Sequence, residues 1–286
     1  MHDFHFHAPS SLKEALDLLS EHSDDSKILA GGTSLTTLLK QSLIAPSHII
    51  SLHRIPGLNS IDLTDGHLNI GGLVTQREME LSALVQKHTP ILAEAYKRVA
   101  TVRVRNVATV GGGIAQADPA MDPPSSLLIL NASITATSSN GSRTLPIHEV
   151  YTDYYETSLE PEEIITALHI PVQPEGTNWT YIKYLPRTED DYATVSVAAI
   201  GKITDGKVAD VRVALGAVAP TAIRANALEE ALIGMQKSSL THEKLKEISQ
   251  TVTAIVDPTD DPRGSAWYKR DMSAVFTRRA LEEVLK

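Results

Sequence analysis

The chain has 286 residues, of which 42% are hydrophobic and 21% charged, a composition that excludes collagen-like, disordered and disulfide-rich proteins. Its 35 acidic and 26 basic residues give a formal charge of −9, which argues against nucleic acid as a partner. Because it has no cysteine, it can hold neither a Cys-ligated iron–sulfur cluster nor a catalytic thiol, so redox chemistry requires an organic cofactor or a partner chain.

The first 55 residues predict a small α/β unit. Ser11 to Glu14 has the spacing of a capping box, which starts a helix there. Strands are expected at 27–30 and 48–52, with a glycine turn and a helix at 35–40 between them. The amino-terminal segment lacks the apolar run of a signal peptide, and no segment reaches the roughly 18 apolar residues of a membrane span. We therefore expect a cytoplasmic protein without a membrane span.

Turn signals near residues 55 and 175 divide the chain into three units, 1–55, 56–175 and 176–286. Three Asx-Gly pairs predict tight hairpins: Asp65-Gly66, Asn140-Gly141 and Asp205-Gly206. The expected strands of the last two units are 61–64, 67–70, 133–137, 143–145, 164–170, 194–203 and 208–215. Helices are expected at 77–99, divided at Pro90, and over Met272 to Val284, where apolar residues recur at helical spacing. The fold class is therefore α+β.

Two glycine clusters are candidates for binding a phosphate group. Gly31-Gly32 and Gly111-Gly112-Gly113 each follow strand-like residues and have Thr or Ser beside them. Successive N–H groups in such turns form anion nests, and a Cβ would obstruct a phosphate, so a pyrophosphate fits two such loops. The alternative is that each cluster is only a tight turn. Neither cluster matches the G-x-G-x-x-G or G-x-x-x-x-G-K-[ST] motif.

The most distinctive motifs of the chain are Ala30-Gly-Gly-Thr-Ser-Leu35, Thr109-Val-Gly-Gly-Gly-Ile-Ala-Gln-Ala-Asp-Pro-Ala-Met-Asp122 and Lys183-Tyr-Leu-Pro-Arg-Thr-Glu-Asp-Asp-Tyr-Ala193. In this order they resemble the FAD-binding medium subunits of molybdenum hydroxylases, a family that includes carbon monoxide dehydrogenase and the flavin domain of xanthine dehydrogenase. The resemblance covers nearly the whole chain. It implies an FAD-binding fold of the vanillyl-alcohol-oxidase type in two subdomains, followed by a carboxy-terminal domain of sheet and helices.

The resemblance also implies which residues hold FAD. The first two domains would bind the extended cofactor, with 27–35 and 109–113 as its two phosphate loops. Asp118 and Asp122 would face the ribityl or adjoining hydroxyls, because a carboxylate accepts hydrogen bonds from hydroxyl groups. The residues assigned to FAD in this way are Lys27, Ile28, Leu29, Ala30, Gly31, Gly32, Thr33, Ser34, Leu35, Thr109, Gly111, Gly112, Gly113, Ala117, Asp118, Asp122, Lys183 and Tyr192. No catalytic side chain is expected.

Several of these assignments have ordinary structural alternatives. Lys183 would stabilise negative charge on a reduced flavin, or it is a solvated strand residue. Tyr192 would cover the flavin ring or control access to it, or it is a half-exposed packing residue. Asp118 and Asp122 stand beside prolines, where a carboxylate commonly caps a turn or a helix.

Two further groups of residues suggest other sites. His5 and His7, with His2 nearby, would share one strand face, but no carboxylate is arranged with them, so no metal site is expected. Arg103 and Arg105 precede the second glycine cluster and would serve a partner contact or a local salt bridge.

The function that the resemblance implies is electron transfer by a flavoprotein subunit. FAD would accept electrons from 2Fe–2S clusters of a small partner chain, which receive them from a molybdopterin cofactor in a large partner chain. The acceptor would be NAD, a quinone or oxygen, and the assembly a dimer of heterotrimers. The alternatives are a stand-alone flavin reductase or oxidase of the same fold, and a non-catalytic assembly subunit whose glycine loops are only turns.

Overall fold

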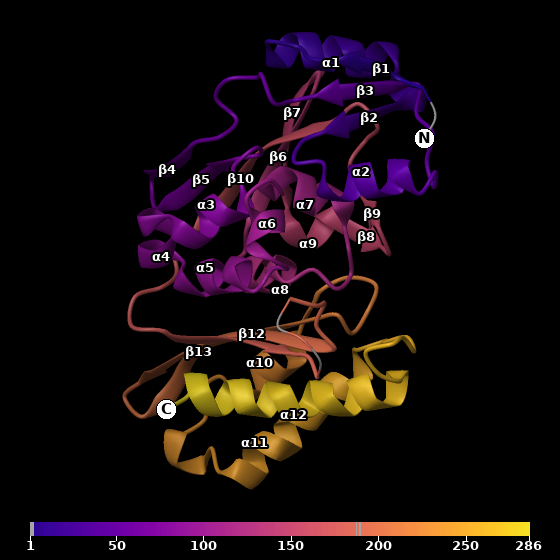
Figure 1. Ribbon diagram of the computed structural model, residues 1–286. Helices are drawn as coiled ribbons and strands as arrows, with labels where there is room; N and C mark the ends of the chain where they lie inside the picture. Colours follow the sequence, from indigo (N-terminus) through magenta and orange to yellow (C-terminus); the bar gives the residue numbers. More distant parts are fainter. Residues whose placement is uncertain (1–2, 187, 189) are drawn as a thin grey trace.

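Three main sheets follow one another along the long axis of the molecule, each with helices of its own (Figure 1). This computed structural model describes residues 3–186, 188 and 190–286. His2, which was considered with His5 and His7, and Arg187 and Glu189 of the third motif lie outside the described residues. The mixture of helices and sheets confirms the predicted α+β class.

The amino-terminal sheet is parallel and has the strand order β1-β3-β2. Its elements are β1 (His5–His7), α1 (Leu12–Glu21), η1 (Ser23–Asp25), β2 (Ser26–Leu29), α2 (Thr33–Lys40) and β3 (His48–Ser51). As predicted, the Ser11 side chain caps α1 by accepting a hydrogen bond from the Glu14 N–H. The reciprocal bond of a capping box is not formed, because the Glu14 carboxylate accepts from the Ser10 N–H instead. Helix α1 buries Leu16 and Leu19 in a small core with Ile50 of β3. Helix α2 begins directly after the first glycine cluster.

The middle sheet is antiparallel, in the order β4-β5-β10-β6-β7. Its strands are β4 (Ile61–Thr64), β5 (His67–Gly71), β6 (Ser133–Ser138), β7 (Gly141–Pro146) and β10 (Ile164–Pro171), and β8 (Tyr151–Asp153) pairs separately with β9 (Glu156–Thr157). The helices of this part are α3 (Gln76–Leu81), α4 (Ala83–His88), α5 (Pro90–Lys97), α6 (Val102–Arg105), α7 (Val110–Gln116), α8 (Pro123–Ile129) and α9 (Ile147–Val150). The predicted hairpins at Asp65-Gly66 and Asn140-Gly141 are confirmed.

The helical stretch predicted at 77–99 has one more break than expected. Pro90 begins α5, as predicted, but Ser82 also interrupts the stretch, with an extended backbone and a side chain that accepts from the Val85 N–H. Serine favours this N-cap position because its hydroxyl satisfies a free N–H of the first turn.

The carboxy-terminal sheet is antiparallel, in the order β11-β12-β13-β14, and helices cover one of its faces (Figure 1). Its elements are β11 (Asn178–Tyr184), β12 (Val195–Thr204), β13 (Lys207–Gly216), β14 (Ile223–Arg224), α10 (Asn226–Leu232), η2 (Lys237–Ser239), α11 (His242–Ser249), η3 (Gln250–Ala254) and α12 (Ala266–Val284). The hairpin at Asp205-Gly206 is confirmed. Strand β11 was not predicted, because no tight-turn pair joins it to β12. Helix α12 begins before the predicted Met272.

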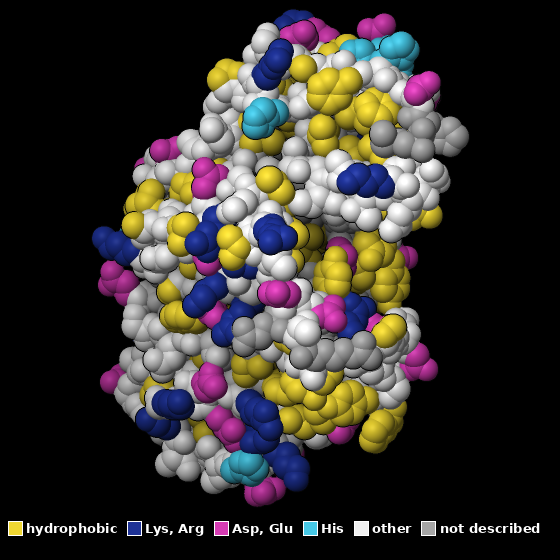
Figure 2. All heavy atoms as spheres, in the orientation of Figure 1, with side chains coloured by type: hydrophobic (Ala, Val, Ile, Leu, Met, Phe, Trp, Pro, Cys, Tyr) yellow, Lys and Arg dark blue, Asp and Glu magenta, His cyan; other side chains and the backbone are white. Residues whose placement is uncertain are grey.

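One hydrophobic core connects the middle and carboxy-terminal sheets. It contains Leu68 of β5, Tyr96 of α5 and Ile129 of α8 together with Ala198 and Ile200 of β12. Helices α5 and α8 therefore lie between the two sheets. Crossing a bilayer takes a long apolar helix, and the described part of the chain contains none. Figure 2 shows acidic and basic side chains interspersed over the visible face, without one large patch of a single sign.

Candidate functional site

The fold brings the two glycine clusters side by side. Gly31 packs so closely on the backbone of Val107 and Ala108 that a Cβ at this position would overlap the Val107 carbonyl oxygen. A Cβ at Gly112 would stand 3.4 Å from the Cβ of Ala30. Two segments that are far apart in the sequence therefore form one continuous surface built mainly of backbone.

The first loop presents free hydrogen-bond donors. Gly32 has a φ of 75° and directly precedes the first turn of α2. None of the N–H groups from Gly31 to Leu35 has an acceptor among the described residues. The positive end of the helix dipole adds to these donors, so this loop is suited to bind an anion such as a phosphate. Lys27 to Leu29 belong to strand β2, which leads into the loop, and Thr33 to Leu35 form the first turn of α2.

The second cluster differs from the prediction, because its glycines lie in helix α7 instead of a turn. The Gly111 N–H donates to the Gly72 carbonyl at 2.9 Å, and the Gly112 and Gly113 N–H groups donate to the hydroxyl and carbonyl of Thr109 at 3.2 and 2.9 Å. The expected nest of free N–H groups is therefore wrong for this loop. Glycine is needed at 111 for close packing, since a Cβ there would stand 2.9 Å from the Gly72 oxygen.

Gln76 and Met121 flank the second cluster and were not among the residues assigned to FAD, although Met121 lies within the second motif. A Cβ on Gly113 would stand 3.3 Å from the Gln76 Nε2 and 3.5 Å from the Met121 sulfur. The Gln76 Oε1 is buried and has no hydrogen-bond partner among the described residues. A donor from a bound molecule would satisfy this oxygen, because buried polar atoms are nearly always paired.

Asp122 and Lys183 form a buried ion pair with 2.9 Å between Oδ2 and Nζ. The Tyr181 hydroxyl donates to Asp122 Oδ1 at 2.7 Å, and the Lys183 ammonium also donates to the Arg98 carbonyl at 2.7 Å. Burial raises the pKa of Asp122 to about 6, although Lys183 acts in the opposite direction. The structure thus brings together Asp122 and Lys183, which the sequence analysis assigned to different parts of the cofactor. Both oxygens of the Asp122 carboxylate already accept a hydrogen bond within the protein.

Asp118 and Tyr192 form a second group with two residues that the sequence analysis missed, Tyr155 and Arg263. Asp118 Oδ1 accepts from the Ala120 N–H at 2.9 Å, which is the predicted turn-capping alternative. Burial, followed by the charge of Asp118, raises the pKa of Tyr192. The Arg263 guanidinium lies 5.5 Å from the centroid of the Tyr192 ring. Tyr192 is 48% exposed, so part of its ring remains accessible.

Two other candidates have simpler explanations in the fold. Ala117 ends α7 with a left-handed φ of 49° and is buried. The Arg105 side chain is buried, with its Nε 3.0 Å from Glu80 Oε2, so the local salt-bridge alternative is correct for Arg105. Arg103 is exposed on the same short helix, α6.

Two surface pockets lie away from the glycine loops. One, of about 450 Å³, lies beside Ile182 and Phe276, and the other, of about 430 Å³, lies beside Leu128 and Arg224. Neither is lined by a residue of the glycine clusters, so neither bears on the anion-binding surface.

Comparison with known proteins shows the family of this chain. The sequence pattern described as "FAD binding domain in molybdopterin dehydrogenase" matches residues 2–173, and "CO dehydrogenase flavoprotein C-terminal domain" matches residues 180–284. This chain belongs to the family of FAD-binding medium subunits of molybdenum hydroxylases. The predicted family is therefore confirmed.

Relatives match along almost the full length of the chain. The carbon monoxide dehydrogenase medium chain of Hydrogenophaga pseudoflava is 36% identical over 278 residues, which is 97% of this chain and 96% of the relative. The xanthine dehydrogenase FAD-binding subunit of Escherichia coli O157:H7 is 32% identical and covers 100% and 97% of the two chains. A solved structure of carbon monoxide dehydrogenase from Hydrogenophaga pseudoflava superposes with a TM-score of 0.94 at 37% identity, covering 99% and 97%. The predicted fold, an FAD-binding domain followed by a carboxy-terminal domain, is confirmed.

Proposed function

We propose that this chain carries FAD on the joined surface of its two glycine loops and acts as the electron-transfer subunit of a molybdenum-cofactor hydroxylase. The observation that carries the proposal is the contact of Gly31 with the Val107 backbone in a chain of this family. FAD can accept single electrons and release two together, and the protein supplies its position and electrostatic surroundings. We also propose that the chain consists of two FAD-binding subdomains, 1–55 and 56–175, and a carboxy-terminal domain, 176–286.

The two loops contribute different interactions. The diphosphate is assigned to the free N–H groups between Gly31 and Leu35. Its oxygens would accept the hydrogen bonds for which these groups have no acceptor among the described residues. The second cluster, at the start of α7, lets the cofactor approach the backbone. Gln76, whose Nε2 lies beside Gly113, provides an acceptor through its Oε1, which has no partner among the described residues. Asp118 provides a carboxylate for a sugar hydroxyl.

Lys183 is assigned to the neighbourhood of the flavin ring, with its position fixed by other residues. Asp122 and the Arg98 carbonyl both accept hydrogen bonds from its ammonium, which limits the movement of the side chain. Asp122 therefore acts on the cofactor mainly by holding Lys183, and not by a free carboxylate oxygen. Tyr192 is assigned to cover the flavin ring or to control access to it, because this residue is half exposed.

The proposed partners are a large chain with a molybdopterin cofactor and a small chain with 2Fe–2S clusters. Relatives are named as medium chains or subunits of dehydrogenases, which supports an assembly of several chains. The absence of cysteine agrees with this division, since the clusters must then be held elsewhere. We propose that the three chains form a heterotrimer, that two heterotrimers form a dimer, and that this assembly lies in the cytoplasm.

Purification of the native complex tests this function. We expect two companion chains, iron, molybdenum and FAD to co-purify with this chain, at the mass of a dimer of heterotrimers. FAD on the chain without companions would instead support a stand-alone flavin reductase or oxidase. Companions without flavin would support an assembly subunit.

A further inference from the structure

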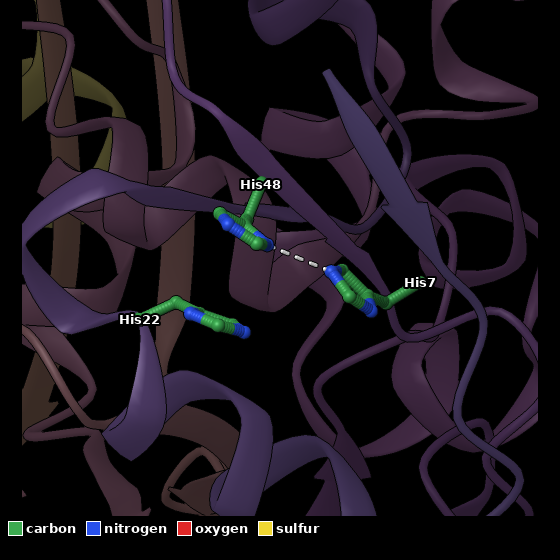
Figure 3. Close-up of side chains that lie close together, drawn as sticks. All are labelled: His7, His22 and His48. Carbon is green, nitrogen blue, oxygen red and sulfur yellow. Dashed lines mark hydrogen bonds between the residues drawn. The ribbon is translucent and has the colours of Figure 1, made fainter.

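Three histidines from separate segments meet on the amino-terminal unit, away from the glycine loops (Figure 3). His7 ends β1, His22 follows the last residue of α1, and His48 begins β3. Parallel pairing of β1 with β3 places His5 opposite His48 and His7 opposite Ile50, so His7 lies diagonally across from His48 on the same face. Helix α1 ends beside them. Figure 2 shows histidine side chains gathered at the upper edge of the molecule.

The ring nitrogens of the three residues converge. One nitrogen from each residue lies within 4.8 Å of the other two. His7 Nε2 and His48 Nδ1 are 2.9 Å apart, as the dashed line in Figure 3 marks. The His22 and His48 rings stack with centroids 3.7 Å apart and an angle of 15° between their planes.

These distances allow the three histidines to coordinate the same metal ion after small movements of the rings. A tetrahedral zinc ion with Zn–N bonds of about 2.0–2.1 Å holds its ligand nitrogens about 3.3 Å apart. The His7–His48 pair must open by a few tenths of an ångström, and the His22 ring must rotate out of its stack. All three side chains are half-buried, so the rings have room to turn at the surface. Imidazole is a preferred ligand of zinc, copper and nickel ions.

We propose that His7, His22 and His48 bind a divalent transition-metal cation of the zinc class. Three imidazoles supply three ligands, and water completes the fourth position. The ion would connect β1, α1 and β3 of the small amino-terminal unit. Asp25, whose carboxylate accepts from the Ser47 N–H at 3.0 Å, adds negative charge near His48.

This site is distinct from the glycine loops. His48 pairs with Ser26 at the start of β2, whereas the first glycine loop follows Leu29 at the end of that strand. The two sites are therefore about 13 Å apart along β2. The proposal differs from the expectation of no metal, which considered His2, His5 and His7 without the two partners that the fold supplies.

Zinc titration of the full-length chain, tag-free and freed of metal by a chelator, tests the proposal. We expect one Zn²⁺ per chain, with His22→Ala and His48→Ala each weakening binding by at least about 10-fold. His148→Ala, which removes an exposed histidine on α9, is the matched control and should leave binding unchanged. Added Co²⁺ should give the visible absorption of a tetrahedral nitrogen site, which both site variants lose.

Three results of the titration would contradict the metal site. No stoichiometric Zn²⁺, or equal binding in wild type and His48→Ala, would show that the three rings are only a packing cluster. Equal losses in His48→Ala and His148→Ala would show nonspecific binding. The FAD content of each variant reports separately on the flavin site and on folding, so a loss of zinc binding with FAD retained concerns the histidines alone.

Discussion

Gly31 lies against the carbonyl oxygen of Val107 with no room for a Cβ between them. This contact fixes the loop that ends β2 against the segment that leads into α7. The free N–H groups of the first loop and the buried Gln76 amide beside the second therefore belong to one surface. The surface depends on glycine for two different reasons, close packing at Gly31 and a left-handed backbone at Gly32.

Gly32→Val should weaken FAD binding by about 10-fold or more. Valine at a φ of 75° is strained by about 1–2 kcal/mol, so the backbone that presents the free N–H groups is disfavoured. Its Cβ would also stand 2.8 Å from the Leu29 Cδ1, so the Leu29 side chain must shift. Flavin titration of the folded variant measures the effect. Gly57→Val is the matched control, because Gly57 has a similar φ of 83° with nothing within 4 Å of its Cβ.

The control should lose stability but keep its FAD affinity. Unchanged affinity in Gly32→Val, or an equal loss of affinity in both variants, would show that the first loop does not hold the cofactor.

Substitutions at Gly113 should have graded effects. Gly113 has no left-handed φ, and its N–H already donates to the Thr109 carbonyl, so asparagine only needs the flexible Gln76 and Met121 side chains to adjust. We expect Gly113→Asn to change the FAD dissociation constant by less than about 10-fold, the range of one hydrogen bond of 0.5–1.5 kcal/mol. Gly113→Val should weaken binding more, because its branched side chain displaces both neighbours. A severe loss with asparagine, or none with valine, would argue against this placement of residue 113.

The buried carboxyl of Asp122 should make stability depend on pH. Its pKa is about 6 in the folded chain against an ordinary value of 3.8, so the folded state holds a proton that the unfolded state releases between these values. This group's contribution to the free energy of unfolding therefore falls as the pH rises from about 4 to 6, by about 2–3 kcal/mol, and is constant above. Chemical unfolding at several pH values, with Asp122→Asn as the reference, isolates the effect.

The difference in stability between wild type and Asp122→Asn should thus decrease across this pH window. Lys183→Met removes the counter-charge, so it should move the decrease to higher pH. A difference that increases with pH would mean that pairing with Lys183 outweighs burial.

The sequence predicts those parts of the fold that depend on neighbouring residues. Asp65-Gly66 and Asn140-Gly141 each have the backbone preference of a tight turn, and the hairpins form there. Strand β11 lacks such a local signal, since its partner β12 follows a long connection. The helical state of Gly113 depends on the Thr109 cap and on packing against the middle sheet, which glycine propensity does not indicate.

In the candidate site, too, the sequence predicts local features but not contacts between distant segments. The glycine motifs were visible in the sequence, and the resemblance to the family implied that they act together. The helical state of the second cluster was not predicted, nor was the ion pair of Asp122 with Lys183, which joins the residue before α8 to β11 of another sheet. Likewise, His22 and His48 become neighbours of His7 only through the parallel sheet. Predicting such contacts requires the tertiary structure, because the number of residues between two side chains does not tell how far apart they lie in space.

The most direct test of the central claim is the FAD content of the purified, folded chain. We predict one FAD per chain, released unmodified by acid precipitation because no covalent link is formed, and rebound when FAD is added back to the stripped protein. A chain with normal far-UV circular dichroism that neither contains nor takes up FAD would contradict the account.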